Sequence, residues 1–362
     1  MPQLTSSRRY ASVGALALAA ALGLSACAGS VEADQTSSAT STDTAESALL
    51  PAAEGHTTYP LTLETPWGTT ELTERPERIA TITGSQDDVE IVVALGGTPV
   101  LASEWTTDAF IEENLTQEIP LRFTTGDEEF PLETIAAAEP DLIIVLGTDL
   151  SEAYDKLAAI APVLGATESG ENEKSAAANW EENILRVGEA LDLQDAAQAA
   201  LAAEDQFFAD FREAHPELEG LTATYAVYYG QEDGLQYHSS SDGPATWVFE
   251  QMGFAANPLA EEFEYRETVS DELLSKIDAD ILIVSDNSDG DSASLTDQPL
   301  FQSLSAVQNG QLILIENLGT SFVIDGVEEA GNLPWALARS GPLSATWAAS
   351  HLAPALQSVL AD

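Results

Sequence analysis

One helix-and-strand pattern occurs twice in this chain, and it constrains the fold more than any other feature. The segment LETIAAAEPDLIIV covers residues 132–145 and DELLSKIDADILIV covers residues 271–284, an offset of 139 residues. In each, a short helical run leads to an aspartate and then to four apolar residues typical of a buried strand. Two such units, each flanked by further strand and helix signals, predict two similar α/β lobes.

Strand and helix signals alternate along the first half of the chain. The segment at 59–72 alternates apolar and polar residues around a Pro-Trp-Gly turn, which predicts a hairpin. A strand at 78–83, a helix at 87–97 and a strand at 99–103 then follow one another. This order is typical of α/β folds. We therefore expect a parallel-rich sheet with flanking helices in each lobe.

A single long helix is expected to join the lobes. Residues 193–216 place four apolar side chains on one helical face and end at a proline: Ala197, Leu201, Phe208 and Phe211. The expected N-terminal lobe is then 58–192, and the expected C-terminal lobe is 217–362.

The first residues have the character of an export signal. Residues 1–26 combine two arginines, an apolar run too short to span a bilayer and small residues before Cys27, the only cysteine of the chain. The LSAC sequence resembles the lipobox of bacterial lipoproteins, so we expect Cys27 to be lipidated; the alternative is an ordinary leader with an incidental cysteine. Residues 27–57, rich in Ser, Thr, Ala and acids, are expected to form a flexible acidic tether. The folded part would thus be anchored at the extracytoplasmic face of the cell membrane.

Charge excludes several classes of partner. The chain has 61 acidic and 12 basic residues and a net charge of −49, which becomes −51 when the two leader arginines are removed. Such a surface repels nucleic acid and anionic lipid. Adaptation to a salty exterior explains the acidity better than attraction of a cationic ligand, because the acids are spread along the whole chain.

The sequence offers little for catalysis or metal binding. It has no nucleophile elbow, P-loop or dinucleotide fingerprint, so an exported enzyme is the less favoured class. The four histidines are dispersed rather than clustered, so we expect no metal site and no cofactor: His56, His215, His238 and His351.

Several segments resemble a known family, the lipid-anchored solute-binding proteins that deliver ferric siderophores, haem or vitamin B12 to ABC importers. The matching segments are RPERIATI, ALGGTPVLAS, LETIAAAEPDLIIV, PLFQSLSAVQNGQLILIE and GPLSATWAASHLAPAL, together with the interlobe helix. The resemblance implies a monomer that holds its ligand between two lobes and meets a permease dimer with its ATPase. It implies an iron(III) siderophore as ligand, with haem or cobalamin as the alternative.

Three arginines are expected at the cleft. The resemblance places the segment of Arg122 at the cleft mouth, and Arg266 and Arg339 on cleft loops of the second lobe. They are three of the ten cations left after the leader. In the alternative interpretation, each is a surface arginine paired with a nearby acid such as Glu128 or Glu264.

Aromatic side chains near these loops could pack on a siderophore, since Tyr and Trp combine apolar area with a polar atom. The expected contacts are Trp105, Tyr229, Tyr237, Tyr265 and Trp335. For Phe123, core packing is equally favoured. Tyr265, polarised by Arg266, could serve as an axial haem ligand, but segment 120–131 offers no donor opposite.

Two glutamates are expected to dock the importer. Glu133 and Glu272 are equivalent under the 139-residue offset and stand in the first turn of equivalent helices. A carboxylate there is already favoured by the helix dipole, which is the alternative explanation for each one alone. In the family that the chain resembles, glutamates at such positions meet permease arginines.

Overall fold

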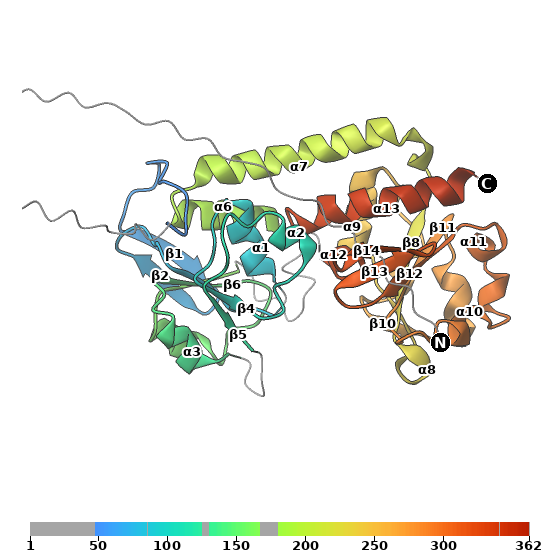
Figure 1. The fold of residues 1–362 in the computed structure, drawn as a ribbon, viewed down its shortest axis with the longest axis horizontal. Coiled ribbons are helices and arrows are strands. Elements are labelled where there is room, and N and C mark those ends of the chain that lie inside the picture. Colours follow the sequence, from blue (N-terminus) through green and yellow to red (C-terminus); the bar gives the residue numbers. More distant parts are fainter. Residues whose placement is uncertain (1–47, 85, 125–129, 167–179, 340, 362) are drawn as a thin grey trace, which may run out of the picture. The chain divides into compact units, whose positions relative to one another are not determined.

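Short apolar runs in the first half of the chain form a sheet of parallel strands. The computed structural model describes residues 48–84, 86–124, 130–166, 180–339 and 341–361. In sheet order the strands are β5 (Leu121–Phe123), β4 (Leu101–Ser103), β3 (Ile79–Thr81), β6 (Leu142–Val145) and β7 (Val163–Gly165). Every neighbouring pair is parallel. This sheet is the centre of the N-terminal lobe (Figure 1).

Helices cover both faces of this sheet because its strands are apolar on both sides. Along β6, Leu142 and Ile144 belong to one apolar cluster, whereas Ile143 and Val145 belong to another. The first cluster includes α1 (Asp87–Ala94), α6 (Trp180–Ala190) and the hairpin of β1 (Leu61–Thr65) and β2 (Gly68–Leu72). The second includes α3 (Leu132–Ala137) and α4 (Tyr154–Ala158). The expected hairpin and α/β layering are thus present.

The second half of the chain forms a mixed sheet. Its order is β10 (Glu267–Val269), β9 (Leu235–Tyr237), β8 (Ala223–Tyr228), β11 (Ile281–Asp286), β12 (Leu312–Asn317), β13 (Ser321–Ile324) and β14 (Val327–Ala330). The three central strands, β8, β11 and β12, are parallel, and the outer strands pair antiparallel. This sheet is the centre of the C-terminal lobe.

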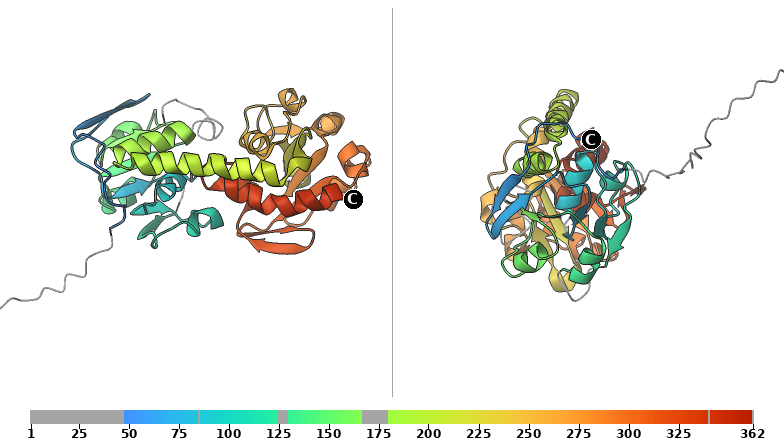
Figure 2. Two further views of the ribbon diagram at one scale, coloured as in Figure 1. Left: turned by 90° about the horizontal axis from the view of Figure 1, so that it is seen from above. Right: turned by 90° about the vertical axis from the view of Figure 1, so that its left-hand side faces the viewer.

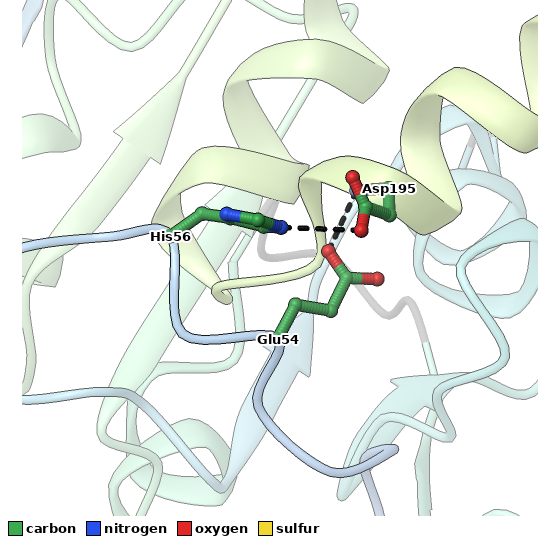
Figure 3. A group of neighbouring side chains, drawn as sticks. All are labelled: Glu54, His56 and Asp195. Atoms are coloured by element: carbon green, nitrogen blue, oxygen red, sulfur yellow. Dashed lines mark hydrogen bonds and ion pairs between the residues drawn. The ribbon is translucent and has the colours of Figure 1, made fainter.

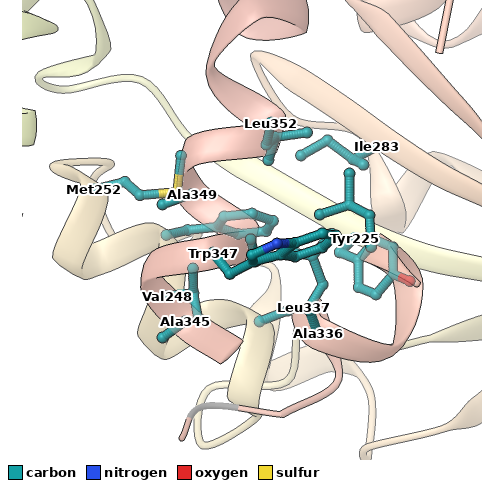
Figure 4. Packing of buried hydrophobic residues seen from close by; sticks show 14 of the residues in the cluster. Tyr225, Val248, Met252, Ile283, Ala336, Leu337, Ala345, Trp347, Ala349 and Leu352 are labelled. Carbon is teal, nitrogen blue, oxygen red and sulfur yellow. The ribbon is translucent and has the colours of Figure 1, made fainter. Parts of the chain in front are cut away.

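Two helices cover one face of the C-terminal sheet. α9 (Pro244–Met252) and α13 (Ser344–Ala361) pack their apolar faces onto β8, β11 and β12. Figure 4 shows Trp347 of α13 among Met252, Tyr225, Ile283 and neighbouring side chains. The N-terminal lobe also contains the short helix α2 (Ala109–Glu112). Further short helices complete the C-terminal lobe: η1 (Pro216–Leu218), α8 (Gly230–Asp233), η2 (Ala260–Glu262), η3 (Asp271–Ile277), α10 (Ala293–Thr296), η4 (Phe301–Ser303), α11 (Ser305–Gln308) and α12 (Leu333–Leu337).

One long helix joins the lobes. α7 spans Gln194–Ala214, 21 residues, and at a rise of about 1.5 Å per residue it is about 30 Å long. It runs beside α13, as Figure 2 shows. The expected fold class, two α/β lobes bridged by one helix, is confirmed.

The repeated sequence unit has the same structural role in both lobes. The carboxylate of Asp141, before β6, accepts the N–H groups of Glu77 and Arg78, just before β3. The equivalent Asp280, before β11, accepts the N–H and hydroxyl of Thr222, just before β8. Each aspartate therefore fixes the entry of the neighbouring parallel strand. The preceding helix differs, because α3 is α-helical whereas η3 is a 3-10 helix.

The expected tether ends earlier than Thr57. From residue 48 the chain lies against the N-terminal lobe: Leu50 is 9% exposed, and the carbonyl of Leu49 accepts the N–H of Thr98. The carboxylate of Asp192 accepts the N–H groups of Gly55, His56 and Thr57. The segment is apolar at 48–53 and polar at 54–57, and the lobe supplies both an apolar surface for Leu50 and hydrogen-bond partners that composition alone does not reveal.

The expected leader 1–26 and Cys27 lie outside the described residues. Within the described part, no helix is both long and apolar enough to cross a membrane.

Candidate ligand-binding cleft

A cavity of about 510 Å³ lies between the two lobes. Its N-terminal wall follows the carboxyl ends of β3 and β4, where parallel sheets typically present ligand sites. That wall consists of Gly84, Gln86, Trp105, Thr107 and Asp108. The C-terminal wall comes from the β12–β13 turn and the start of α12, with Gly319, Thr320, Asn332 and Trp335. The cavity size is in the ordinary range for small-molecule sites.

A smaller cavity, of about 60 Å³, extends into the C-terminal lobe and shares Asn332 and Trp335 with the first. Three of its residues lie at the carboxyl ends of the central strands. Tyr229 comes directly after β8, Asn287 directly after β11, and Asn317 is the last residue of β12. The rest of its wall is Tyr225, Val227, His238, Tyr265, Arg266, Pro334 and Ala338. The two cavities together form the candidate cleft.

The two tryptophans that line the larger cavity differ in how firmly neighbouring residues hold them. Trp105 is 60% exposed on the N-terminal wall. Trp335 stands opposite on α12, where the Asn332 side chain accepts its backbone N–H at 3.0 Å. The guanidinium of Arg339 lies 4.1 Å from the centroid of the Trp335 ring. Trp335 is therefore a fixed surface, and Trp105 is a solvent-facing one.

Arg339 is placed behind the cleft wall rather than on it. It is 2% exposed, and its Nη1 lies 3.7 Å from Oδ2 of Asp87 on α1. The predicted contribution of this arginine is thus indirect: it stacks beneath Trp335 and pairs with a carboxylate of the other lobe. A buried guanidinium requires such partners.

Arg266 lines the smaller cavity as expected. Its backbone is left-handed, with φ at 63°, and its N–H donates to the carbonyl of Tyr237 at 2.7 Å. Gln86, on the other lobe, also has a positive φ, 69°, and lines the larger cavity. Non-glycine residues in this conformation are strained, and such strain gathers at functional sites.

Arg122 has a different position from the one expected. It lies on β5, where it donates to the carbonyl of Thr106 and pairs with Glu112 at 2.8 Å. It lines neither of the two cavities in the described part of the chain. The structure thus gives it an acid as partner, Glu112 rather than Glu128, which lies outside the described residues. Through Thr106 it supports the loop that carries Trp105 and Asp108.

Tyr237 belongs to the core and not to the cleft. Its side chain is 0% exposed and packs on Phe263 with ring centroids 4.7 Å apart; burial raises the pKa of its hydroxyl to about 12. Phe123 is likewise a core residue. The next residue after Tyr237, His238, faces the cavity instead. Successive side chains of an extended segment point to opposite sides. Tyr237 therefore points into the core, and the next residue, His238, points to the cavity.

His238 lines the cleft, although the sequence indicated only that it was one of four dispersed histidines. It is 3% exposed, and its ring lies beside those of Tyr225 and Tyr265, with centroids 5.7 and 5.2 Å away. Burial, and then the charge of Arg266, lower its pKa to about 3. The imidazole is therefore neutral at physiological pH.

Asp108 is the second residue that sequence reasoning missed. Its carboxylate accepts a hydrogen bond from the side-chain amide of Gln86 at 2.7 Å. Burial raises its pKa to about 6, while Gln86 and the charge of Arg339 act in the opposite direction. Gln86 and Asp108 follow the strands predicted at 78–83 and 99–103, and this is the sequence signal that could have indicated them.

A carboxylate of the N-terminal lobe contacts the C-terminal lobe beside the cleft. Glu90 on α1 accepts the N–H groups of Leu343 and Ser344, at 2.8 and 2.7 Å, at the start of α13. A Cβ on Gly341 would lie 2.4 Å from this carboxylate, so only glycine fits there. This contact links segments 254 residues apart without contributing to a cavity wall.

A separate surface group, Glu54, His56 and Asp195, brings three potential metal ligands within 4.8 Å of one another (Figure 3). The contacts have a structural explanation. Glu54 accepts the N–H groups of Asp195 and Ala196 in the first turn of α7, and His56 contacts the Asp195 carboxylate at 3.1 Å. These side chains cap the interlobe helix, an ordinary role for acids at a helix start.

The expected docking glutamates are both exposed. Glu133 lies in the first turn of α3 and Glu272 in the first turn of η3. Neither lines a described cavity, so each is available to a macromolecular partner.

Comparison with known proteins gives the family. The model for a periplasmic binding protein matches residues 79–317, which is most of the two lobes. This chain belongs to the periplasmic binding protein family. The family consists of extracytoplasmic solute-binding proteins rather than enzymes, in agreement with the sequence analysis.

Two curated relatives come from Bacillus subtilis strain 168. The Fe(3+)-citrate-binding protein YfmC is 30% identical over 254 residues, 68% of this chain and 75% of that protein. The probable siderophore-binding lipoprotein YfiY is 26% identical over 278 residues, 70% of this chain and 82% of that protein.

Solved structures share the fold. A periplasmic solute-binding protein from Mycobacterium smegmatis superposes with a TM-score of 0.66 at 24% identity, covering 83% of this chain and 98% of the other. PiaA from Streptococcus pneumoniae, in complex with ferrichrome, superposes with a TM-score of 0.62 at 22% identity, covering 82% and 98%. At these identities the likeness supports the architecture and not the ligand.

Proposed function

We propose that this protein captures a ferric siderophore outside the cell and delivers it to an ABC importer. The observation that carries the proposal is the cavity of about 510 Å³ whose two walls come from different lobes and each present a tryptophan, Trp105 and Trp335. The two relatives named for ferric citrate and siderophore binding support it.

The chemistry of the cleft suits an amphipathic metal chelate. Indole and phenol rings offer flat apolar area with polar edges, which can pack on the organic arms of a chelator. Amides and hydroxyls between the rings can hydrogen-bond the oxygen atoms that surround iron. The polar groups are Gln86, Thr107, Asn287, Asn317, Thr320 and Asn332.

Haem is the alternative ligand, and the cleft supports it less well. A haem site needs an axial donor, typically His, Tyr, Cys or Met. The C-terminal lobe offers Tyr265 and His238, but the described N-terminal wall offers none of these types. Neither relative is named for haem or cobalamin.

The proposed location is the outer face of the cell membrane. Cys27, after a leader and within LSAC, would carry the lipid, and the acidic segment before residue 48 would separate the anchor from the lobes. The relative named as a lipoprotein supports this placement. The protein would act as a monomer, with Glu133 and Glu272 meeting the permease dimer and no bound cofactor apart from the cargo.

A quenching titration tests the proposed function. The chain without its leader, carrying Cys27→Ala, is titrated with ferric siderophores, their iron-free forms, haem and cobalamin while tryptophan fluorescence is followed. Saturable quenching by a ferric siderophore, reduced in Trp105→Phe but retained in Trp67→Phe on the β1–β2 hairpin, is the expected result. Saturable quenching by haem alone would favour the alternative, and no binding by any compound would overturn both.

A further inference from the structure

The cleft is poor in positive charge for a site that is to hold an iron chelate. Of the twelve basic residues in the sequence, nine are described by the structure. Most of these nine line neither cavity. Backbone carbonyls accept from Arg75, Arg78, Arg186 and Arg212, while Lys276 pairs with Glu262 and Lys156 is exposed on α4.

The remaining three arginines give one cation on a cavity wall. Arg122 is held by Thr106 and Glu112 outside both cavities. Arg339 is enclosed behind Trp335 and paired with Asp87. Only Arg266, among the described residues, lines a cavity, and it lies in the smaller one.

The larger cavity carries the opposite charge. Asp108 is its only charged wall residue in the described ranges. With a pKa of about 6, this carboxyl is mostly ionised at neutral pH. The other polar wall groups are uncharged amides and hydroxyls. Arg339 lies behind this wall, but its charge is shared between Asp87 and Asp108 and its guanidinium does not line the cavity. Since a buried anion needs opposite charge or strong donors in contact with it, this wall disfavours an anionic ligand.

Long-range electrostatics act in the same direction. The chain carries a net charge of −49, and the residues outside the described ranges after the leader add many acids and a single cation, Lys174. A field of this sign repels anions and concentrates cations at clefts.

Ferric chelates differ in charge by chemical class. A hydroxamate group carries one negative charge when it binds iron, so a ferric trihydroxamate is formally uncharged, and an additional ammonium makes it a cation. A ferric tris-catecholate is a trianion, and ferric citrate complexes are also anionic. These classes can therefore be separated by electrostatics even when their sizes are similar.

We propose that the cleft selects uncharged or cationic ferric trihydroxamates over anionic citrate and catecholate chelates. This inference rests on the proposed siderophore function and deepens it. Trp105 and Trp335 contact the aliphatic arms of the chelator. Side-chain amides of the C-terminal lobe, the lobe that carries Arg266, contact the hydroxamate oxygens. The carboxylate of Asp108 favours a cationic arm. The chain thus differs in ligand class from the relative named for ferric citrate.

The test is a competition between chelate classes on one protein preparation. Dissociation constants are measured by tryptophan quenching for ferrioxamine B, which is cationic, ferrichrome, which is uncharged, ferric citrate and ferric enterobactin. We expect the two trihydroxamates to bind at least about 100-fold more tightly than the two anions. Added salt should weaken ferrioxamine B binding more than ferrichrome binding.

Two variants make the charge argument specific. Asp108→Asn should weaken ferrioxamine B about 10-fold more than it weakens ferrichrome, since only the former carries an ammonium. Asp205→Asn, on the exposed face of α7, removes the same charge at a remote place and should change neither. Thr320→Arg adds a cation to an exposed position of the cavity wall and should tighten ferric citrate.

The outcomes separate the two proposals. Tightest binding of ferric citrate or ferric enterobactin would overturn the charge selection while the siderophore function stands. Binding of no ferric chelate at all would overturn the function itself. If Asp108→Asn does not fold, the Thr320→Arg arm decides: unchanged citrate binding counts against the electrostatic explanation.

Discussion

The carboxylate of Glu90, in the N-terminal lobe, accepts hydrogen bonds from the backbone N–H and the hydroxyl of Ser344, in the C-terminal lobe, at 2.7 and 3.3 Å. Ser344 begins α13, an 18-residue helix, so the acid meets the positive end of a long helix dipole. Both side chains are buried. Together with α7, this contact fixes the lobes on either side of the cleft.

Replacing Glu90 should loosen the connection between the lobes. Glu90→Ala leaves the buried N–H groups of Leu343 and Ser344 without acceptors, which costs about 1–3 kcal/mol of unfolding free energy per group. We expect a lower Tm and weaker ligand binding, measured by calorimetry and by quenching. Gly341→Ala should also destabilise, because its Cβ would meet the carboxylate, whereas Gly84→Ala has open space and is the control for stability. An unchanged Tm in Glu90→Ala would show that the contact is dispensable.

The stability of the fold should decrease from mildly acidic to mildly alkaline pH. Burial, and then the charges of Glu181, Asp205 and Glu90, raise the pKa of Glu204 to about 8 from 4.5. Because the folded state holds this proton more tightly than the unfolded state, the contribution to stability is complete below about pH 4.5 and is lost as the pH rises through 8.

Removing that titration should flatten the pH dependence. Glu204→Gln is expected to raise the Tm at pH 8 relative to the parent protein and to change it little at pH 5, as measured by calorimetry across this range. Glu213→Gln, at an exposed position of the same helix and not among the charges that act on Glu204, is the matched control for loss of one surface charge. A Glu204→Gln variant with the pH profile of the parent protein would contradict the assignment to this carboxyl.

Substitutions at Tyr237 and His238 should have different effects on ligand affinity. Tyr237→Phe keeps the ring packed on Phe263 and should leave ligand affinity unchanged, because the residue lies in the core. His238→Ala removes a ring from the cavity wall and should weaken binding by about 1 kcal/mol or more. Quenching titrations measure both. Weaker binding in Tyr237→Phe with no change in His238→Ala would indicate the opposite register.

Arg266 and Arg122 should also differ. Arg266→Ala should weaken siderophore binding by about 1.5–3 kcal/mol, the range for a hydrogen bond that involves a charged group, and Arg266→Lys should restore part of it. Arg122→Ala removes the support of the Thr106 carbonyl and should reduce affinity less. Equal losses in both alanine variants would return Arg122 to direct ligand contact.

The exposed glutamates Glu133 and Glu272 should matter for uptake and not for binding. The double change to Ala is expected to leave ligand affinity normal in solution and to impair iron uptake by cells, since separated carboxylates set the orientation of a two-fold partner. Changing the exposed acids Glu113 and Asp205 instead is the control for charge. Normal uptake by the Glu133/Glu272 variant, or loss of ligand binding in a folded protein, would count against docking.

Local patterns in the sequence were enough to predict the architecture. A buried parallel strand is apolar on both faces, so runs such as residues 142–145 and 281–284 identify the strands of both lobes. The apolar face of residues 194–214 likewise identifies the interlobe helix. These signals depend on neighbours within one or two turns of chain, which is why they can be read without tertiary structure.

The cleft depended on tertiary structure. The sequence indicated Trp105, Tyr229, Tyr265, Arg266 and Trp335, which line the cavities, but it also indicated Tyr237, which the pleat of its extended segment turns into the core. It could not separate Arg266 on the wall from Arg339 behind it, because that difference comes from packing against Trp335 and Asp87. It could not extend the N-terminal lobe back to residue 48, because the partners of that segment lie across the fold at Asp192 and Thr98. Fold class follows from local hydrophobic periodicity, whereas the charge and shape of the cleft follow from which distant side chains meet.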